Sequence, residues 1–328
     1  FMFLYLVTAA CSNTNELFSD ENDDSPEIDI SDKKTNILFI IADDMGLDAS
    51  PGYDIGTLKP NMPNLQKLMD SGVKFTNLWS NPTCTPTRAG IITGKYGFRT
   101  NVLAVDDPLS TSETSLQKYI DIKTNDEYAN AVIGKWHLSR DVNHPNNMGV
   151  DYYAGVLGGG VPSYYNWSLV QNGKTSNSKE YTTTKFTDLA IDWIGEQSKP
   201  WFLWLAYNAP HTPFHVPPSE LHYQGYLSTD QGVIDANPLP YYMAAIEALD
   251  TEMGRLINTL SEEDKENTVV IFIGDNGTPN QVAQEYQRRR VKGSIYQGGV
   301  NVPMVISGKG VTRINNLEDA LINTTDLF

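Results

Sequence analysis

Carboxylate and amide side chains follow two of the most apolar segments of the sequence. Asp43-Asp44 comes directly after Ile37–Ala42, and Asp275-Asn276 follows Thr268–Ile273 after a single glycine. Such runs are typical of strands buried on both faces of a parallel sheet, and open α/β sheets bind ligands at the carboxyl ends of their strands. These oxygen ligands suit Ca²⁺ or Mg²⁺ better than Zn²⁺. Together the two pairs indicate one divalent cation site, although each alone could form a turn and the first a helix cap.

A cysteine and an arginine lie in the segment Pro82–Gly94. Cys84 is followed by Pro86 and Arg88. A buried thiol can act as a small apolar residue, but this would not explain Arg88, whose guanidinium fork suits an oxyanion or a hydrated aldehyde. The Cys-x-Pro-x-Arg pattern, with Thr93-Gly94 at the end of the segment, resembles the signature of the formylglycine-dependent, cysteine-type sulfatases of the alkaline phosphatase superfamily.

The resemblance implies a covalent mechanism at Cys84. In that family a maturase oxidises the cysteine to formylglycine, whose aldehyde hydrates to a gem-diol. One hydroxyl attacks sulfur and the other expels sulfate by C–O cleavage, whereas a serine would remain sulfated. The matching family residues hold one Ca²⁺ beside the formylglycine, so the expected metal ligands are Asp43, Asp44, Cys84, Asp275 and Asn276. Asp275 or a neighbour would accept the proton of the nucleophile.

The segment Gly134–His137 resembles the second signature of the family. The resemblance implies that Lys135 meets the sulfate and that His137 contacts the formylglycine hydrate. The sequence departs from the family upstream, where Glu127 and Asn130 stand at positions at which glycine and threonine are common. Taken alone, the segment could hold an exposed lysine and a capping histidine.

Two later segments resemble the remaining signatures. Asn208–Pro213 implies that His211 faces the oxygen of the leaving group. Val291–Pro303 implies that Lys292 is a second lysine on the sulfate. The resemblance therefore extends from about Asn36 to the end of the sequence.

Two further segments allow both a functional and a structural interpretation. Arg288-Arg289-Arg290 could be a solvated basic turn or a rim that attracts a polyanionic substrate. Tyr152-Tyr153, Gly158-Gly159-Gly160 and Tyr164–Trp167 are expected to form one aromatic, glycine-rich loop. Its rings could stack on sugars or simply pack the loop.

The elements that position these residues follow from hydrophobic periodicity. The predicted strands are Ile37–Ala42, Val73–Trp79, Ala131–Ile133, Trp201–Ala206, Thr268–Ile273 and Val302–Ile306. The predicted helices are Pro63–Ser71, Thr184–Glu196 and Tyr241–Leu260. Strands that alternate with helices predict an α/β fold with a mostly parallel central sheet and helices on both faces. The resemblance implies the alkaline-phosphatase-like form of that fold.

The N-terminal residues of the sequence indicate an exported protein. Residues 1–11 resemble the end of a signal peptide with a bacterial lipobox before Cys11, although Thr8 stands where leucine is usual; an ordinary signal peptide is the alternative. Residues 12–35 are strongly acidic and predict a disordered tether. A lipid on Cys11 would be the only contact with a membrane. We expect a location in the bacterial cell envelope, as a periplasmic protein or an outer-membrane lipoprotein.

Residues 36–328 are expected to form the catalytic domain of a sulfatase. The start of the signal peptide and the smaller C-terminal subdomain of the family are expected to be missing from this sequence. The net charge of −16 argues against a nucleic-acid partner. The sequence thus predicts a sulfuric ester hydrolase for a sulfated glycan or an aryl sulfate. The alternatives are a phosphonate monoester or phosphodiester hydrolase of the same superfamily and a non-catalytic anion-binding relative.

Overall fold

The computed structural model describes residues 34–287 and 289–328. The expected signal segment, Cys11 and most of the acidic tether therefore lie outside the described residues, as does Arg288. Within the described ranges, no helix is both long enough and apolar enough to cross a membrane.

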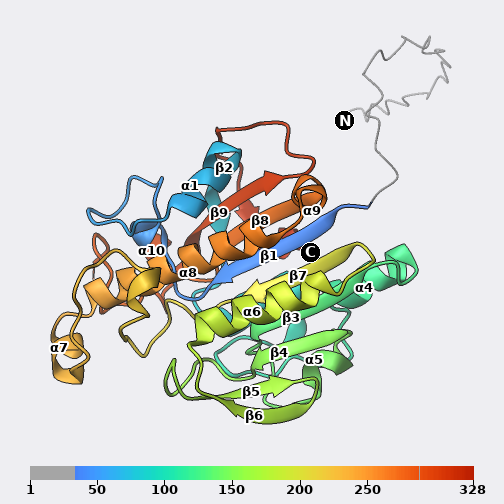
Figure 1. Cartoon of the computed structure of the whole chain (residues 1–328), viewed down its shortest axis with the longest axis horizontal. Helices are drawn as coiled ribbons and strands as arrows, with labels where there is room; N and C mark the ends of the chain where they lie inside the picture. The colour runs from blue at the N-terminus through green and yellow to red at the C-terminus, as the bar shows by residue number, and fades with distance from the viewer. Residues whose placement is uncertain (1–33, 288) are drawn as a thin grey trace, which may run out of the picture. The chain divides into compact units, whose positions relative to one another are not determined.

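One open sheet of eleven strands organises the described part of the chain (Figure 1). The strands are β1 Asn36–Ala42, β2 Gly72–Trp79, β3 Ala129–Lys135, β4 Tyr152–Val156, β5 Trp167–Gln171, β6 Lys174–Ser178, β7 Trp201–Ala206, β8 Thr268–Gly274, β9 Asn301–Gly308, β10 Asn316–Glu318 and β11 Ile322–Asn323. Their order is β10-β2-β9-β8-β1-β7-β3-β4-β5-β6, and β11 also pairs with β2. The central strands β8, β1, β7, β3 and β4 run parallel, as predicted.

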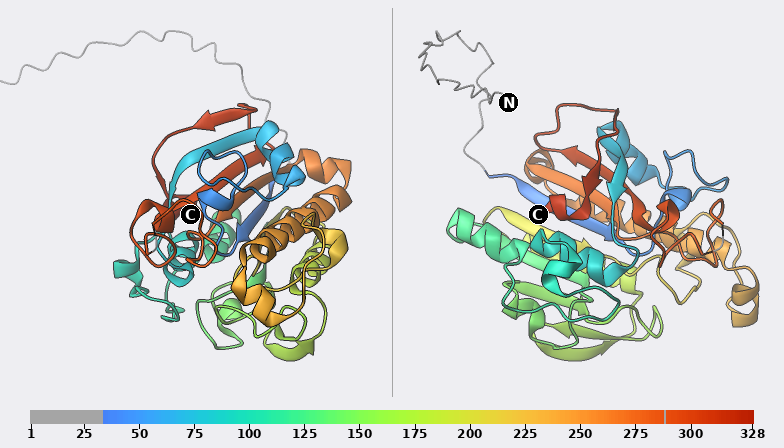
Figure 2. Two further views of the ribbon diagram at one scale, coloured as in Figure 1. Left: turned by 90° about the vertical axis from the view of Figure 1, so that its left-hand side faces the viewer. Right: turned by 180° about the vertical axis from the view of Figure 1, so that it is seen from behind.

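Helices cover both faces of this sheet, which confirms the predicted α/β architecture (Figures 1 and 2). The α-helices are α1 Pro63–Asp70, α2 Cys84–Thr93, α3 Gly97–Thr100, α4 Leu116–Thr124, α5 His144–Asn147, α6 Thr182–Gly195, α7 Gln231–Ala236, α8 Leu239–Thr259, α9 Glu262–Glu266 and α10 Gln297–Val300. The 3₁₀-helices are η1 Leu47–Ala49, η2 Ser219–Leu221 and η3 Thr324–Leu327.

Strand β1 shows why the central strands have continuous apolar sequences. Leu38 and Ile40 belong to the apolar cluster under α1, α6 and α8, whereas Phe39 and Ile41 belong to the cluster on the other face, with α2. All four side chains are buried. Because successive residues of a strand point to opposite faces, a strand covered on both sides needs apolar residues at every position.

Two predicted strands differ from expectation in direction or length. The predicted strand Val302–Ile306 is β9, which runs antiparallel to both β8 and β2. The strand predicted at Ala131–Ile133 is the longer β3, which includes the buried Asn130. The Asn130 side chain donates to the Asp151 carboxylate at 3.0 Å and accepts from the Asp151 backbone N–H at 3.0 Å. This pairing satisfies a polar residue inside a strand.

The prediction of one aromatic loop between residues 152 and 167 is wrong in part. Tyr152-Tyr153 lies in β4, where Tyr153 is fully buried, and Trp167 is the buried first residue of β5. The Tyr153 and Trp167 rings belong to the core and are unavailable to a sugar. A loop does connect the two strands, and it contains the three consecutive glycines.

Gly134, next to the predicted site residue Lys135, provides a test of the packing between β3 and β7. Its φ is +106°, and a Cβ built there would lie 1.9 Å from the carbonyl oxygen of Ala206. We expect Gly134→Ala to lower the free energy of unfolding by at least about 2 kcal/mol, because both the backbone conformation and the contact are unfavourable for a side chain. Gly195→Ala is the matched control, since a Cβ at this helical position meets nothing within 4 Å. Equal thermal unfolding midpoints for the two variants would contradict this description of the β3–β7 contact.

Candidate active site

The register of the two central strands β1 and β8 brings their polar ends together. Ala42 pairs with Gly274, so the residues that follow, Asp43 and Asp275, leave the sheet side by side. The Asp44 backbone N–H donates to Asp275 Oδ1 at 3.0 Å. The Asn276 amide donates to Asp44 Oδ1 at 2.8 Å. All four side chains are buried at the carboxyl edge of the sheet.

Several oxygens at this edge are suitable ligands for a hard cation. Asp43, Asp44 and His211 each offer a ligand atom, and these atoms lie within 4.8 Å of one another. Asp43 Oδ1 and Asn276 Oδ1 are buried and accept no hydrogen bond from the described residues. Buried oxygens of native proteins normally have a partner, and a cation can serve as one. The oxygens of Asp43, Asp44 and Asn276 therefore fit Ca²⁺ or Mg²⁺, as the sequence predicts, and His211 offers a nitrogen beside them.

Cys84 and Arg88 are positioned by helix α2, which begins at Cys84. Residues four apart in a helix share one face, so both side chains point toward the same end of the sheet. Arg88 is fully buried, and its Nε and Nη2 donate to Asp275 Oδ2 at 3.2 and 2.9 Å. Its Nη1 donates to the carbonyl oxygen of Lys135 at 2.7 Å. Arg88 thus ties helix α2 to β3 and to the end of β8.

The two lysines of the predicted site pair with the two consecutive aspartates. Lys135 Nζ lies 2.6 Å from Asp43 Oδ2, and Lys292 Nζ lies 2.5 Å from Asp44 Oδ2. Burial raises the pKa of Asp43 to about 6, although Lys135 acts in the opposite direction. For Asp44 the effect of burial is outweighed by the charges of His211, Lys292 and Lys135, which lower its pKa to about 2.

The fixed charges of the site nearly balance. The carboxylates Asp43, Asp44 and Asp275 face the cations Arg88, Lys135 and Lys292. A divalent cation added to this balanced set would make the site positive. An oxyanion such as a sulfate ester would then be attracted, because electrostatic interactions are strong where water is excluded.

His137 contacts the sulfur of Cys84 directly. Its Nδ1 lies 3.2 Å from Cys84 Sγ, and its Nε2 lies 3.0 Å from Asp106 Oδ1. Burial, together with the nearby charges of Lys135 and Arg88, lowers the pKa of His137 to about 3. The ring is therefore neutral near neutral pH. Burial also raises the pKa of the Cys84 thiol, so the unmodified cysteine is a protonated and weak nucleophile.

His211 approaches the same site from the loop after β7. Its Nδ1 donates to the carbonyl oxygen of Thr212 at 2.7 Å, and its Nε2 lies 3.7 Å from Asp44 Oδ2. This hydrogen bond directs Nε2 toward the carboxylates.

The glycine-rich loop between β4 and β5 lies against both histidines. A Cβ at Gly159 would lie 2.5 Å from the His137 ring, and a Cβ at Gly160 would lie 3.2 Å from the His211 ring. The absence of side chains from Gly159 and Gly160 leaves room for the two histidine rings.

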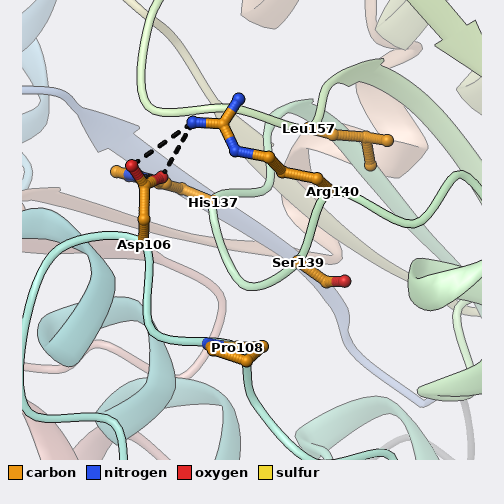
Figure 3. Close-up of a pocket in the computed structure, with 6 residues that line it drawn as sticks. All are labelled: Asp106, Pro108, His137, Ser139, Arg140 and Leu157. Atoms are coloured by element: carbon orange, nitrogen blue, oxygen red, sulfur yellow. Dashed lines mark hydrogen bonds and ion pairs between the residues drawn. The ribbon is translucent and has the colours of Figure 1, made fainter.

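Beside His137 there is a cavity of about 210 Å³, lined by Asp106, Pro108, His137, Ser139, Arg140 and Leu157 (Figure 3).

The structure gathers the predicted site residues at one place. Hydrogen bonds and ion pairs connect eight of them, and the Cys84–His137 pair lies near enough to Lys135 to be affected by its charge. The gathered residues are Asp43, Asp44, Cys84, Arg88, Lys135, His137, His211, Asp275, Asn276 and Lys292. Arg289 and Arg290 are exposed, and Arg290 lies over the Tyr296 ring at 4.6 Å. Sequence reasoning missed Asp106 and the contacts of the two glycines, since no signature includes Asp106 and the glycines predict only a loop.

Comparisons with known proteins agree with this site and fold. The family model Sulfatase matches residues 35–328. The chain is 28% identical to the uncharacterized sulfatase YdeN of Escherichia coli (strain K12), over 98% of this chain and 66% of that protein. It is 26% identical to N-acetylgalactosamine-6-sulfatase of Homo sapiens, over 89% of this chain and 60% of that protein. The solved structure of Ps i-CgsB in complex with k-i-k-neocarrahexaose aligns with a TM-score of 0.76 and 26% identity, over 90% of this chain and 70% of that one.

Because the family model spans most of the chain, the protein belongs to the sulfatase family. The alkaline-phosphatase-like α/β fold that the sequence predicts is confirmed by the structural comparison. The chain spans 51% to 66% of the length of three curated relatives.

Proposed function

We propose that this protein hydrolyses sulfate esters of a glycan through a formylglycine formed at Cys84. The observation that carries the proposal is the contact of Cys84 with His137 at 3.2 Å, beside Lys135, in a member of the sulfatase family. A nucleophile, a neutral histidine and a cation thus meet in one buried place. This combination suits transfer of a charged group better than passive binding of an anion.

A formylglycine at position 84 would supply a hydrated aldehyde, in which one hydroxyl attacks sulfur and the second allows sulfate to leave by C–O cleavage. A Ca²⁺ held by Asp43, Asp44, Asp275, Asn276 and the modified residue 84 would act as a Lewis acid on the sulfate. Asp43 Oδ1 and Asn276 Oδ1, which accept no hydrogen bond from the described residues, support this ligand set.

The other side chains have roles that follow from their contacts. Lys135 and Lys292 form ion pairs with Asp43 and Asp44. Both lysines are charged and can also contact the sulfate oxygens, where they would stabilise the negative charge that develops during the reaction. His137 Nδ1 faces residue 84 and can accept a hydroxyl proton. His211 Nε2 faces the site and can donate a proton to the departing alcohol.

Arg88 and Asp275 also have positioning roles that follow from their contacts with each other and with the backbone. Arg88 Nε and Nη2 donate to the Asp275 carboxylate, and Arg88 Nη1 donates to the backbone carbonyl of Lys135. Arg88 therefore acts on the nucleophile mainly by holding helix α2 against the metal ligands. Asp275 uses one oxygen for Arg88 and the other for the Asp44 backbone, and its remaining lone pairs can bind a cation.

The names of similar proteins favour a glycan as the substrate of this protein. One similar protein is named as a sulfatase of N-acetylgalactosamine, and one similar structure holds k-i-k-neocarrahexaose. The exposed Arg290 and Arg289 would add positive charge beside Lys292 in a strongly acidic protein and could attract a polyanion. An aryl sulfate remains a useful laboratory substrate for the same chemistry.

The preference between sulfate and phosphate esters tests this proposal. We expect the matured enzyme to favour a fluorogenic sulfate ester over the matched phosphate mono- and diesters by roughly tenfold or more in kcat/KM, about 1.4 kcal/mol of transition-state discrimination. Parallel kinetics with the three esters of one phenol provide the measurement. A reversed preference would favour a phosphonate monoester or phosphodiester hydrolase. No turnover of any ester by fully matured protein would favour a non-catalytic anion-binding protein.

A further inference from the structure

Asp106 forms a continuous chain of contacts with the nucleophile through His137. The Asp106 carboxylate binds His137 Nε2 at 3.0 Å, and the opposite ring nitrogen faces Cys84 Sγ at 3.2 Å. Figure 3 shows the His137 ring and the Arg140 guanidinium converging on this carboxylate. Arg140 Nη2 binds the two carboxylate oxygens at 3.2 and 3.3 Å.

The backbone around Asp106 is built to hold the carboxylate in this place. Its N–H donates to the hydroxyl of Thr85, the residue after the nucleophile, at 3.2 Å. Three residues later, the Leu109 N–H donates to the Leu138 carbonyl at 2.9 Å, which ties this loop to the His137 segment. Asp106 and His137 both have positive φ, +67° and +56°. Non-glycine residues adopt this conformation at an energetic cost. Its occurrence at both Asp106 and His137 indicates that the surrounding structure holds these two residues in contact.

The carboxylate determines which nitrogen of His137 carries the proton. An ionised carboxylate can only accept a hydrogen bond, so Nε2 must be the donor. Burial alone would raise the pKa of Asp106, but its interactions with His137 and then with Arg140 outweigh burial and lower that pKa. In a neutral ring with its proton on Nε2, Nδ1 presents a lone pair to residue 84.

We infer that Asp106 is a positioning residue, which fixes His137 as the Nε2–H tautomer so that Nδ1 can accept a proton from residue 84. Arg140 in turn fixes the carboxylate. The inference rests on the proposed function for its kinetic consequence, but the tautomer of His137 can be measured whether or not the protein turns over a sulfate ester.

The replacement Asp106→Asn tests the inference with little change of shape, at a side chain that is half exposed. Arg140 would keep the amide oxygen as its acceptor, which leaves the amide NH₂ facing His137 Nε2. Nε2 must then accept, and the proton moves to Nδ1. We expect kcat for a sulfate ester to fall by about 10²-fold or more with KM little changed, since loss of general base catalysis costs this much.

A second variant separates the tautomer from a general structural effect. In Asp106→Asn/Arg140→Ala the amide is free to rotate and accept from His137 Nε2–H, so kcat should recover by roughly tenfold. Asp107→Asn is the matched control. Asp107 lies in the same loop and accepts from the Leu103 and Ala104 backbone N–H groups, without contacting His137. We expect this control to keep the unmutated kcat.

Nitrogen NMR of the full-length protein labelled at its five histidines reads the tautomer directly. The signals of His137 are assigned by their loss in His137→Gln. We expect a protonated Nε2 and an unprotonated Nδ1 in the unmutated protein, and the reverse in Asp106→Asn. A protonated Nδ1 in the unmutated protein, or an unchanged tautomer and kcat in Asp106→Asn, would overturn the inference. If the unmutated protein shows the expected tautomer but hydrolyses no sulfate ester, the proposed function fails and the positioning role of Asp106 stands.

Discussion

Replacement of Cys84 by alanine is expected to lower kcat/KM for a sulfate ester by about 10⁵-fold, because it removes the group that attacks sulfur. The fold should survive, since Cys84 is a small buried side chain at the first position of helix α2. Thermal unfolding of the variant gives the control for stability, with an expected loss of only about 1 kcal/mol. Activity within tenfold of the unmutated enzyme would exclude Cys84 as the nucleophile.

Cys84→Ser provides a sharper test of the same residue. A serine can attack sulfur once, but it lacks the second hydroxyl that would release the sulfate. We expect this variant to stall with sulfate covalently attached to residue 84, whereas Cys84→Ala should show no adduct. Mass spectrometry of the intact protein after incubation with substrate distinguishes the two. Sustained turnover by the serine variant would mean that release needs no second hydroxyl.

Removal of the metal is expected to have the second largest effect. Exhaustive chelation should lower kcat/KM by roughly 10³-fold, about 4 kcal/mol of transition-state stabilisation, and added Ca²⁺ should restore it. Asp44→Asn should have a similar effect, because Asp44 lies among the oxygens and cations of the site. Asp54→Asn is the control, since Asp54 is an exposed carboxylate on the segment that follows β1.

Metal analysis and thermal unfolding give readouts of the same site that do not depend on activity. We expect one Ca²⁺ per chain in the purified protein and a higher unfolding temperature with saturating Ca²⁺, since a ligand at about a hundred times its Kd adds about 2.7 kcal/mol. Bound zinc in place of calcium, or full activity after chelation, would contradict the hard-cation site.

Much of the fold could be predicted because the central strands are buried on both faces. The continuous apolar runs at β1, β7 and β8 match the predicted ranges to within a residue or two. Apolar composition does not encode strand direction, so the antiparallel course of β9 could not be foreseen. Local pattern also missed the start of β3, because Asn130 becomes acceptable in a strand only through its tertiary pairing with Asp151.

The site was predictable where its residues follow strands or belong to recognisable signatures. Asp43 and Asp275 follow two apolar runs, and a parallel register then places them together. Asp106 has no such signal. It reaches His137 through a loop held by hydrogen bonds to Thr85 and, through Leu109, to Leu138, and these contacts join segments far apart in the sequence. Only the distances from His137 to Asp106 and to Cys84 in the structure indicate that Asp106 positions His137.

The chemical state of residue 84 in an active preparation tests the central claim most directly. The full-length protein should be produced with a competent formylglycine-generating maturase, shown to hydrolyse a sulfate ester, and digested with trypsin for mass spectrometry of the peptide that contains residue 84. We predict formylglycine at this position, in an amount that rises in proportion to activity across preparations of different maturation. Full activity in a preparation whose Cys84 is entirely unmodified would contradict the account.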